Sequence, residues 1–326
     1  MLSEKVINSF YKKNVLVTGG TGMIGRQVVK ILCDAGAAVK VASLDGFSVD
    51  RRAEHVFGDL CNLDFCLDLT KDMEFVFHMA GVGASAQTTM KKPASHSVPT
   101  LMVNTNVLEA SRRNNVQRLV YTSSVGAYAN AEILKESQGR ELPPMDFYAG
   151  WAKRMAEYQI KAYKAQYGID SYAVVRLSNV YGPGDNFHPA NSLVIPSLIY
   201  RLYNNENPLA VYGDGSEIRD FVYSKDAAEG VILALYHGTG ADFVNIGGIK
   251  GCSIKEVVET LKLFIDFEYV FDTTKPRGYP KRVLDSSLAI RRLGYSPSVS
   301  LEEGLRLTWD WFVNNPGDYL LKQNYF

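Results

Sequence analysis

Three glycines, Gly19, Gly22 and Gly25, follow an apolar segment over Asn14–Thr18 with the spacing G-x-x-G-x-x-G. A helical hydrophobic pattern begins directly after them, so the glycines lie where a buried strand turns into a helix. Glycine allows a tight turn and a close approach of the backbone to phosphate oxygens, which the N–H groups at a helix start attract. The pattern therefore predicts a dinucleotide-binding turn, with contacts expected from Gly19, Gly22, Met23, Ile24 and Gly25.

The end of the next expected strand bears on which dinucleotide is bound. An acid there would bind the adenosine ribose hydroxyls of NAD and repel the 2′-phosphate of NADP. The chain has Ser43 at that place and Asp45 two residues later, while Arg51 and Arg52 could neutralise a phosphate. Asp45 could instead do the work of the acid. Both NADP and NAD stay open on this pattern, with NADP slightly favoured.

Apolar segments alternate with helical patterns along the first half of the chain. This order predicts an α/β fold, a Rossmann-type doubly wound parallel sheet with helices on both faces. A further strand is expected before Gly58, and the two residues that follow, Asp59 and Leu60, have the form of a contact with an adenine edge. The other strands are expected at Asn14–Thr18, Val39–Ala42, Glu74–His78, Arg118–Thr122 and Ser171–Leu177.

Turn residues break the chain into shorter elements after Tyr181. We expect residues 1–180 to form the dinucleotide-binding domain and residues 181–326 to form mainly a smaller C-terminal substrate-binding lobe. An apolar segment within about 240–250 could return to the main sheet. Ligands of such sheets bind beyond the carboxyl ends of the strands, which predicts a cleft between the two lobes.

Composition excludes several classes of protein. The 326 residues contain 35 Lys and Arg against 35 Asp and Glu, so the chain has no net positive charge with which to hold a nucleic acid backbone. The apolar share of 46% is ordinary for a globular protein, and no apolar run approaches the length of a membrane span. Four cysteines without a CxxC pair predict reduced thiols in a cytoplasmic protein and no metal site.

Several motifs together resemble a known family. The glycine turn, His78-Met-Ala-Gly81, Tyr121-Thr-Ser-Ser124 and Trp151-Ala-Lys153 are similar to the extended short-chain dehydrogenases that modify nucleotide-activated sugars, the NAD-dependent epimerase/dehydratase family. Segments of the second half are similar to the GDP-L-fucose synthases, which are GDP-4-keto-6-deoxymannose epimerase/reductases. These segments are Asn179–Asn191, Val194–Pro196, Arg219–Phe221 and Lys275–Pro280 leading to Asp285.

The resemblance covers nearly the whole chain and implies roles in hydride chemistry. Ser124 would orient the sugar carbonyl, and Lys153 would bind the nicotinamide ribose. Lys153 would also lower the pKa of a catalytic tyrosine that exchanges a proton with the sugar oxygen. Ala80, within the His78–Gly81 motif, is implied as a further cofactor contact.

The tyrosine departs from the family pattern, Tyr-x-x-x-Lys. Position 149 is Ala149, and the nearest tyrosine is Tyr148, five residues before Lys153. Five helical steps turn a side chain to about 140° from Lys153, against about 40° for four steps. Tyr148 could still reach the site if the helix begins just after it, and it is the candidate phenol on that condition. Otherwise the chain was altered at position 149 or uses another proton donor.

The resemblance implies further substrate contacts. His188, in Asn-Phe-His-Pro, matches the histidine with which GDP-L-fucose synthases epimerise, but their cysteine position is Gly126. Positions 125 and 126 also lack the Asp-Glu pair of the 4,6-dehydratases. Arg219 is implied as a ligand of the nucleotide diphosphate, Lys275 as a weaker one, and Asn179 as a substrate contact.

These expectations define an NAD(P)-dependent nucleotide-sugar epimerase/reductase that transfers hydride at C4 of a GDP-linked 4-keto-6-deoxy sugar. One alternative is a nucleotide-sugar 4-epimerase with tightly bound NAD. Another, of a different class, is a non-catalytic NAD(P)-sensing binding module. The family also implies a homodimer built through helices at about Leu101–Arg113 and Trp151–Lys164.

Overall fold

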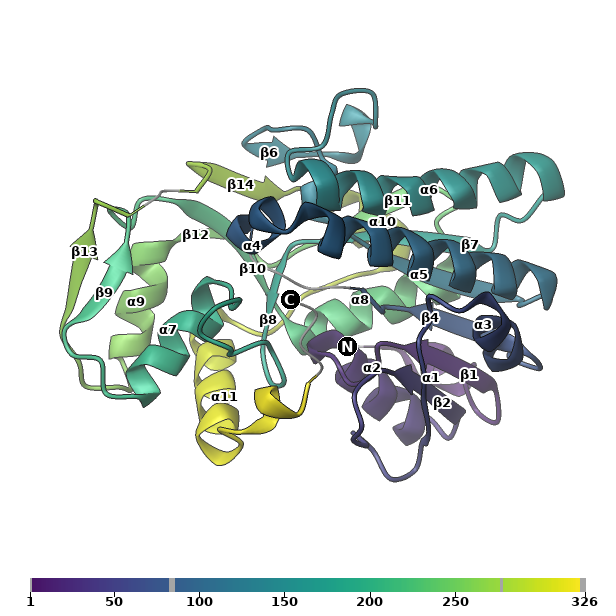
Figure 1. The fold of residues 1–326 in the computed structure, drawn as a ribbon, viewed down its shortest axis with the longest axis horizontal. Helices are drawn as coiled ribbons and strands as arrows, with labels where there is room; N and C mark the ends of the chain where they lie inside the picture. The colour runs from purple at the N-terminus through teal and green to yellow at the C-terminus, as the bar shows by residue number, and fades with distance from the viewer. Residues whose placement is uncertain (1, 82–85, 276–277, 323–326) are drawn as a thin grey trace.

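The computed structural model describes residues 2–81, 86–275 and 278–322. Its centre is a seven-stranded sheet with the order β11-β7-β5-β4-β1-β2-β3, in which each pair of neighbours is parallel (Figure 1). The α/β prediction is confirmed. The strands are β1 (Asn14–Thr18), β2 (Ala38–Ser43), β3 (Glu54–Phe57), β4 (Phe75–His78), β5 (Arg118–Ser124), β7 (Tyr172–Leu177) and β11 (Phe243–Ile246).

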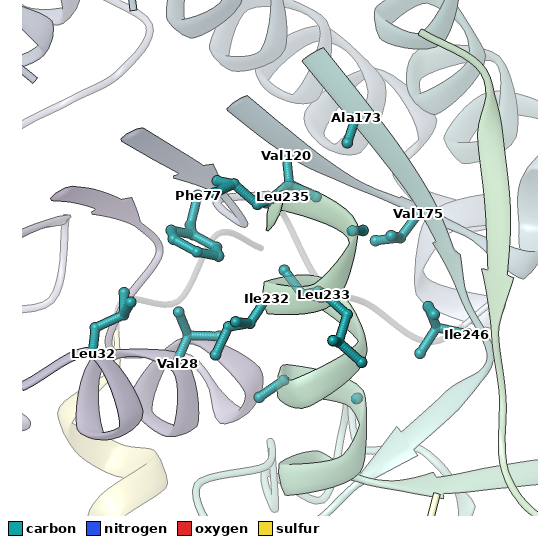
Figure 2. Close-up of a cluster of buried hydrophobic side chains, with 14 of the residues drawn as sticks. Val28, Leu32, Phe77, Val120, Ala173, Val175, Ile232, Leu233, Leu235 and Ile246 are labelled. Atoms are coloured by element: carbon teal, nitrogen blue, oxygen red, sulfur yellow. The ribbon is translucent and has the colours of Figure 1, made fainter. Parts of the chain in front are cut away.

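The central strands are near-continuous apolar runs because helices cover both faces of the sheet. One face packs against α2 (Met23–Asp34) and α8 (Ser224–His237). Figure 2 shows this core, in which Val28 and Leu32 of α2 meet Ile232 of α8 beneath the strand residues Phe77 and Val120. The other face packs against α3 (Leu63–Thr70), α5 (Pro93–Arg113) and α6 (Phe147–Tyr167).

Two elements from the second half of the chain belong to the lobe that is built on the main sheet. Strand β11 pairs with β7 at the edge of the main sheet, and helix α8 covers one of its faces. The short helices α1 (Glu4–Asn8) and α10 (Ser287–Leu293) also belong to this lobe, and α4 (Ala86–Lys91) precedes α5. The chain therefore crosses between the two lobes more than once (Figure 1).

The smaller lobe has its own apolar core. Strand β10 (Ile218–Tyr223) is parallel to β8 (Asn179–Tyr181) and β14 (Lys281–Leu284) and antiparallel to β12 (Gly251–Ser253). Strand β6 (Ile133–Leu134) extends this sheet, and β9 (Leu209–Tyr212) pairs with β13 (Tyr269–Asp272). The remaining elements are α7 (Val194–Tyr203), α9 (Ile254–Lys262), α11 (Leu301–Asn314) and the 3₁₀ helices η1 (Val125–Ala127), η2 (Glu136–Gln138) and η3 (Asp318–Leu321).

A buried carboxylate, Glu157 of α6, joins this helix to two strands. It accepts hydrogen bonds from the hydroxyl of Ser123 at 2.6 Å, from Arg176 of β7 at 2.7 and 2.9 Å, and from Arg140 at 2.7 Å. Burial alone would raise the pKa of Glu157, but the hydrogen bonds and charges of the two arginines hold it below its ordinary value. Glu157 therefore stays ionised and fixes α6 against the ends of β5 and β7.

Replacing Glu157 by Gln should destabilise the fold strongly. Arg176 is fully buried and would lose its anion, and breaking a buried pair in this way typically costs about 3–5 kcal/mol. Asp242→Asn is the matched control, because Asp242 pairs with the same Arg140 from an exposed position and should cost less than about 1 kcal/mol. Urea unfolding of the three proteins measures both values, and equal stabilities would contradict the role given to Glu157.

Candidate active site

The glycine turn has the geometry of a phosphate cradle. Gly19 has a φ of +70°, and a Cβ there would lie 2.8 Å from the backbone of Ala80. A Cβ on Gly25 would lie 2.2 Å from the carbonyl oxygen of Gly19, so helix and strand pack backbone to backbone. Helix α2 begins at Met23 with Gly22 as its N-cap, which offers no side-chain cap. Its first N–H groups are therefore available to a phosphate, as the sequence pattern requires.

A cavity of about 650 Å³ lies over this turn, at the carboxyl ends of the strands. That volume suits a cofactor or small ligand. Its walls include most of the residues predicted to bind the cofactor, namely Gly19, Gly22, Met23, Ser43, Asp59, Leu60 and Ala80. Ile24 and Gly25 are not among the lining residues. The residues present thus fit a bound dinucleotide.

The far wall of the cavity comes from distant parts of the chain. The loop after β8 contributes Gly184, Asp185, Asn186, His188 and Asn191, and η3 with the next residue contributes Tyr319, Leu320 and Lys322. Arg26 of α2 forms an ion pair with Asp318 at 3.1 Å, and the Lys322 ammonium donates to the carbonyl of Gly184. The cavity therefore lies between the main sheet and the last described segment.

The end of β2 presents an acid to this cavity. Asp45 lines it, and the Thr21 hydroxyl donates to Asp45 Oδ2 at 2.5 Å. Thr21 also contacts the Ser43 hydroxyl at 2.7 Å. By contrast, Arg52 forms ion pairs with Asp34 at 2.8 Å and Asp50 at 2.6 Å, and neither Arg51 nor Arg52 lines the cavity.

Ser124 and Lys153 lie at the end of β5. Lys153 Nζ donates to the Thr122 carbonyl at 2.9 Å, two residues before Ser124. The same ammonium lies 5.2 Å from the ring of Tyr121, and it would be 3.4 Å from a Cβ on the cavity residue Gly81. Burial lowers the pKa of Lys153 to about 8, although the charge of Glu157 acts against this. The structure thus brings Lys153 next to the cavity residue Gly81 and close to the end of β5, where Ser124 lies, but neither Ser124 nor Lys153 is among the lining residues.

A neutral, buried histidine belongs to the hydrogen-bond network next to Lys153. His78 contacts Thr18 Oγ1 at 2.8 Å and Asn104 Oδ1 at 3.0 Å, and the Asn104 amide donates to the Tyr121 hydroxyl at 3.0 Å. Burial lowers the pKa of His78 to about 3, and Lys153 acts in the same direction. His78 is therefore uncharged and positions Tyr121 beneath Lys153.

The condition under which Tyr148 could reach the site, a helix that begins just after it, is not met. Helix α6 begins at Phe147, so Tyr148 already has helical geometry and is turned about 140° from Lys153. Its ring is 47% exposed and packs edge-on against Phe147, with centroids 5.3 Å apart. The structure does not bring Tyr148 to the site, and the position that shares a helix face with Lys153 is Ala149.

The smaller lobe contributes two arginines that face each other. Arg219 of β10 and Arg282 of β14 are register partners on neighbouring parallel strands. Burial lowers the pKa of Arg219 to about 10, and the charge of Arg282 acts in the same direction. Arg282 donates to Asn179 Oδ1 at 3.2 Å, and its buried Nε has no hydrogen-bond partner among the described residues. Two adjacent cations, one of them with an unused buried donor, can attract an anion.

Sequence reasoning found Arg219 and Asn179 but missed Arg282. The sequence of Lys281–Leu284 does not alternate and offers no local signal, so the pairing of β14 with β10 is what places Arg282 beside Arg219. Lys275 is exposed, and its ammonium lies 5.9 Å from the Tyr212 ring rather than at the cavity. His188 lines the cavity, where its Nδ1 accepts from the Ala190 N–H at 3.2 Å.

Two classes of site are not observed in the part of the chain that the structure describes. It contains no group of three or more His, Cys, Asp or Glu side chains that could hold a metal ion. Among its helices, none combines the length and the apolar character of a membrane span.

Comparison with known proteins points to one family. The model of the NAD dependent epimerase/dehydratase family matches residues 15–247. The chain is 32% identical to the probable GDP-L-fucose synthase 1 of Oryza sativa subsp. japonica, over 92% of both chains. It is 31% identical to a putative UDP-glucose 4-epimerase of Methanocaldococcus jannaschii, over 92% of this chain and 99% of that protein. The structure of the UDP-glucose 4-epimerase of Thermotoga maritima with UDP-glucose superposes with a TM-score of 0.82 at 28% identity, over 93% of this chain and 99% of that one.

The buried ammonium of Lys153 should be visible in the pH dependence of stability. Its pKa is lowered from 10.5 to about 8 in the folded chain, so between these values the unfolded chain binds one more proton. The contribution of Lys153 to stability therefore rises as the pH rises through about 8. Lys153→Met should gain stability relative to wild type at about pH 7, and this gain should shrink by about pH 9.5.

Urea unfolding at both pH values measures that difference. Lys161→Met is the matched control, since Lys161 is an exposed lysine on the same helix, and its difference from wild type should not change with pH. A constant difference for Lys153→Met would show that its pKa is not lowered.

Proposed function

We propose, from the premise that the chain belongs to the NAD dependent epimerase/dehydratase family, that it acts on a GDP-linked 4-keto-6-deoxy sugar by hydride transfer at C4. The chain is an NAD(P)-dependent nucleotide-sugar enzyme of the epimerase/reductase type. The GDP-linked substrate is favoured by the identity to GDP-L-fucose synthases over most of the chain.

The observation that carries the proposal is the position of the Lys153 ammonium, which would be 3.4 Å from a Cβ on Gly81, a residue that lines the dinucleotide cavity. The same ammonium donates to the carbonyl of Thr122, two residues before Ser124 on β5. Arg219 and Arg282 follow in the smaller lobe, where they can bind a nucleotide diphosphate in bidentate fashion. A sugar joined to that diphosphate would reach back toward Ser124.

The chain's own residues would bind and orient the reactants. When bound, NAD(P) supplies the hydride that is exchanged with C4. Lys153 offers its ammonium to the nicotinamide ribose. Because the pKa of Lys153 is about 8, the side chain is mostly protonated at neutral pH. The Ser124 hydroxyl donates to the C4 oxygen of the sugar, while it accepts from the Gly126 N–H at 3.2 Å. His188, which belongs to the smaller lobe, exchanges a proton with the sugar.

We propose NAD as the preferred cofactor, in contrast to the slight preference for NADP drawn from the sequence. Asp45 lies in the cavity at the end of β2, where its charge would repel a 2′-phosphate and its oxygens would accept from ribose hydroxyls. The two arginines that could have favoured NADP lie outside the cavity lining.

A specific observation favours the second candidate, a 4-epimerase with tightly bound NAD. Tyr319, Leu320 and Lys322 form one wall of the cavity, and the ion pair between Arg26 and Asp318 holds this segment on α2. A cofactor held behind this wall would leave more slowly than one on an open surface, which suits an enzyme that returns its hydride to the same sugar. Similarity to a putative UDP-glucose 4-epimerase agrees with this candidate.

The helices α5 and α6 support a homodimer as a further proposal. Both expose large apolar side chains, a feature typical of protein contact surfaces. These are Val98, Met102, Met155 and Tyr158.

Turnover with GDP-4-keto-6-deoxymannose and NADH tests the function. We expect nicotinamide absorbance to fall and proton NMR to show a GDP-6-deoxyhexose reduced at C4. NAD that survives purification, together with interconversion of C4 epimers of a nucleotide sugar, would support the second candidate instead. The absence of turnover with either substrate class would contradict both enzyme proposals.

Position 149 supplies a sharper form of this assay. Ala149→Tyr places a phenol four residues before Lys153, on the same face of α6, and should raise turnover about 100-fold or more by general acid–base catalysis. Tyr148→Phe should change turnover less than about twofold, because Tyr148 is turned away. A large loss in Tyr148→Phe would instead identify Tyr148 as the working phenol.

Asp45→Asn tests the cofactor preference. The amide keeps an oxygen that can accept from Thr21, but it removes the charge that opposes a 2′-phosphate. We expect the ratio of kcat/KM for NADPH over NADH to rise about tenfold or more. Asp68→Asn, an exposed acid on α3 outside the cavity lining, is the control and should leave the ratio unchanged.

A further inference from the structure

A carboxylate lies against Gly126, the position two residues after Ser124. A Cβ on Gly126 would be 2.2 Å from Asp146 Oδ2 and 2.9 Å from its Cγ. The Gly126 carbonyl also lies close to α6, because a Cβ on Gly150 would be 2.5 Å from it. The Asp146 carboxylate therefore occupies the space that a side chain at position 126 would fill, and such a side chain would require the carboxylate to move.

The Asp146 carboxylate has no structural task that explains its place. It is the N-cap of α6, yet it makes no side-chain capping hydrogen bond, although Asp is among the preferred capping residues. Within the described residues, its contact with a cation is an ion pair with Arg282 at 3.8 Å, longer than a hydrogen bond. Its side chain is 32% exposed, so the carboxylate is open to a ligand.

The surroundings of Asp146 are those of the proposed substrate site. Ser124 is joined to Gly126 by the hydrogen bond from its N–H, so the Ser124 hydroxyl and the Asp146 carboxylate border the same turn, η1. On its other side, Arg282 links Asp146 to Asn179 and Arg219. A sugar placed between Ser124 and the arginine pair would therefore lie beside Asp146.

We propose that Asp146 is the catalytic residue that transfers a proton at the ring carbon next to the C4 ketone. This role rests on the proposed function, which supplies a 4-keto sugar. Asp146 thus provides, from the start of α6, the proton-transfer group that position 126 lacks.

The proton transfer balances without an oxidant. The Asp146 carboxylate takes the proton as the C–H bond breaks, and the electron pair of that bond forms an enolate whose negative charge lies on the former carbonyl oxygen. Ser124 is placed to donate to that oxygen. A proton returned to the carbon from His188, which belongs to the other lobe, restores the ketone with inverted configuration. Asp146 then releases its proton to water, and His188 takes a proton from water.

Exchange of ring hydrogens with solvent tests this step separately from hydride transfer. The enzyme is incubated with GDP-4-keto-6-deoxymannose in D₂O without nicotinamide cofactor, and proton NMR follows loss of the signals beside the ketone. Wild type should exchange these hydrogens, and the exchange rate of Asp146→Asn should be lower by about 100-fold or more. Oxidation of NADH with the same sugar should persist in Asp146→Asn, because Ser124 and Lys153 remain.

Two further variants separate chemistry from folding. Gly126→Ala keeps the carboxylate but displaces it, since the new Cβ would overlap Oδ2, and should slow exchange about tenfold or more. Glu132→Gln removes an exposed carboxylate that pairs with Lys281 and should exchange at the wild-type rate. Thermal unfolding should give similar midpoints for Asp146→Asn and wild type, because Asp146 makes no capping bond.

The outcomes are distinct. Exchange at the wild-type rate in Asp146→Asn would overturn the proposal. So would a wild-type protein that oxidises NADH without exchanging ring hydrogens, and in that case the hydride function stands. A wild-type protein that does neither would overturn the proposed function and this role together.

Discussion

The candidate active site depends on the buried carboxylate of Glu157. It binds Ser123, the neighbour of Ser124 in β5, and it lies one helical turn after Lys153 on α6. The same carboxylate holds Arg176 of β7. Strand β5 and helix α6 approach each other only through tertiary packing, and this carboxylate fixes their relative position. That position sets the distance between the Ser124 hydroxyl and the Lys153 ammonium. The charge of Glu157 also limits how far burial can lower the pKa of Lys153.

The layered fold could be predicted because each of its main elements has a local signature. Strands such as Asn14–Thr18 are continuous apolar runs, and the turn at Gly19–Gly25 follows from the conformational needs of a backbone that meets a phosphate. The place of α8 in the lobe built on the main sheet had no such signature. A helix with apolar residues on most of its surface can pack on either lobe, so tertiary contacts decide where it lies.

The residues of the candidate site also fall into those that could be placed from the sequence and those that depend on tertiary contacts. Residues that follow a strand or a motif directly, such as Ser124 and Lys153, could be placed from the sequence. Arg282 and Asp146 acquire their roles only from tertiary contacts: Arg282 lies more than a hundred residues from its neighbours Asn179 and Asp146 in the sequence, and strand pairing places it beside Arg219. Tyr148 shows the limit in the other direction, since one residue of difference in the start of α6 turns its ring out of the site.

The wall formed by Tyr319, Leu320 and Lys322 couples the cofactor cavity to the order of synthesis. The glycine turn leaves the ribosome about three hundred residues before this wall, and α8 and β11 of the same lobe also follow late, so the cavity is completed only when the last described segment has been made. A ligand that binds the finished fold stabilises it by mass action, and that stabilisation is delayed until the final segment docks on α2. Full cofactor affinity thus reports that translation has reached the last described segment, and extensions added there would act on the cavity directly.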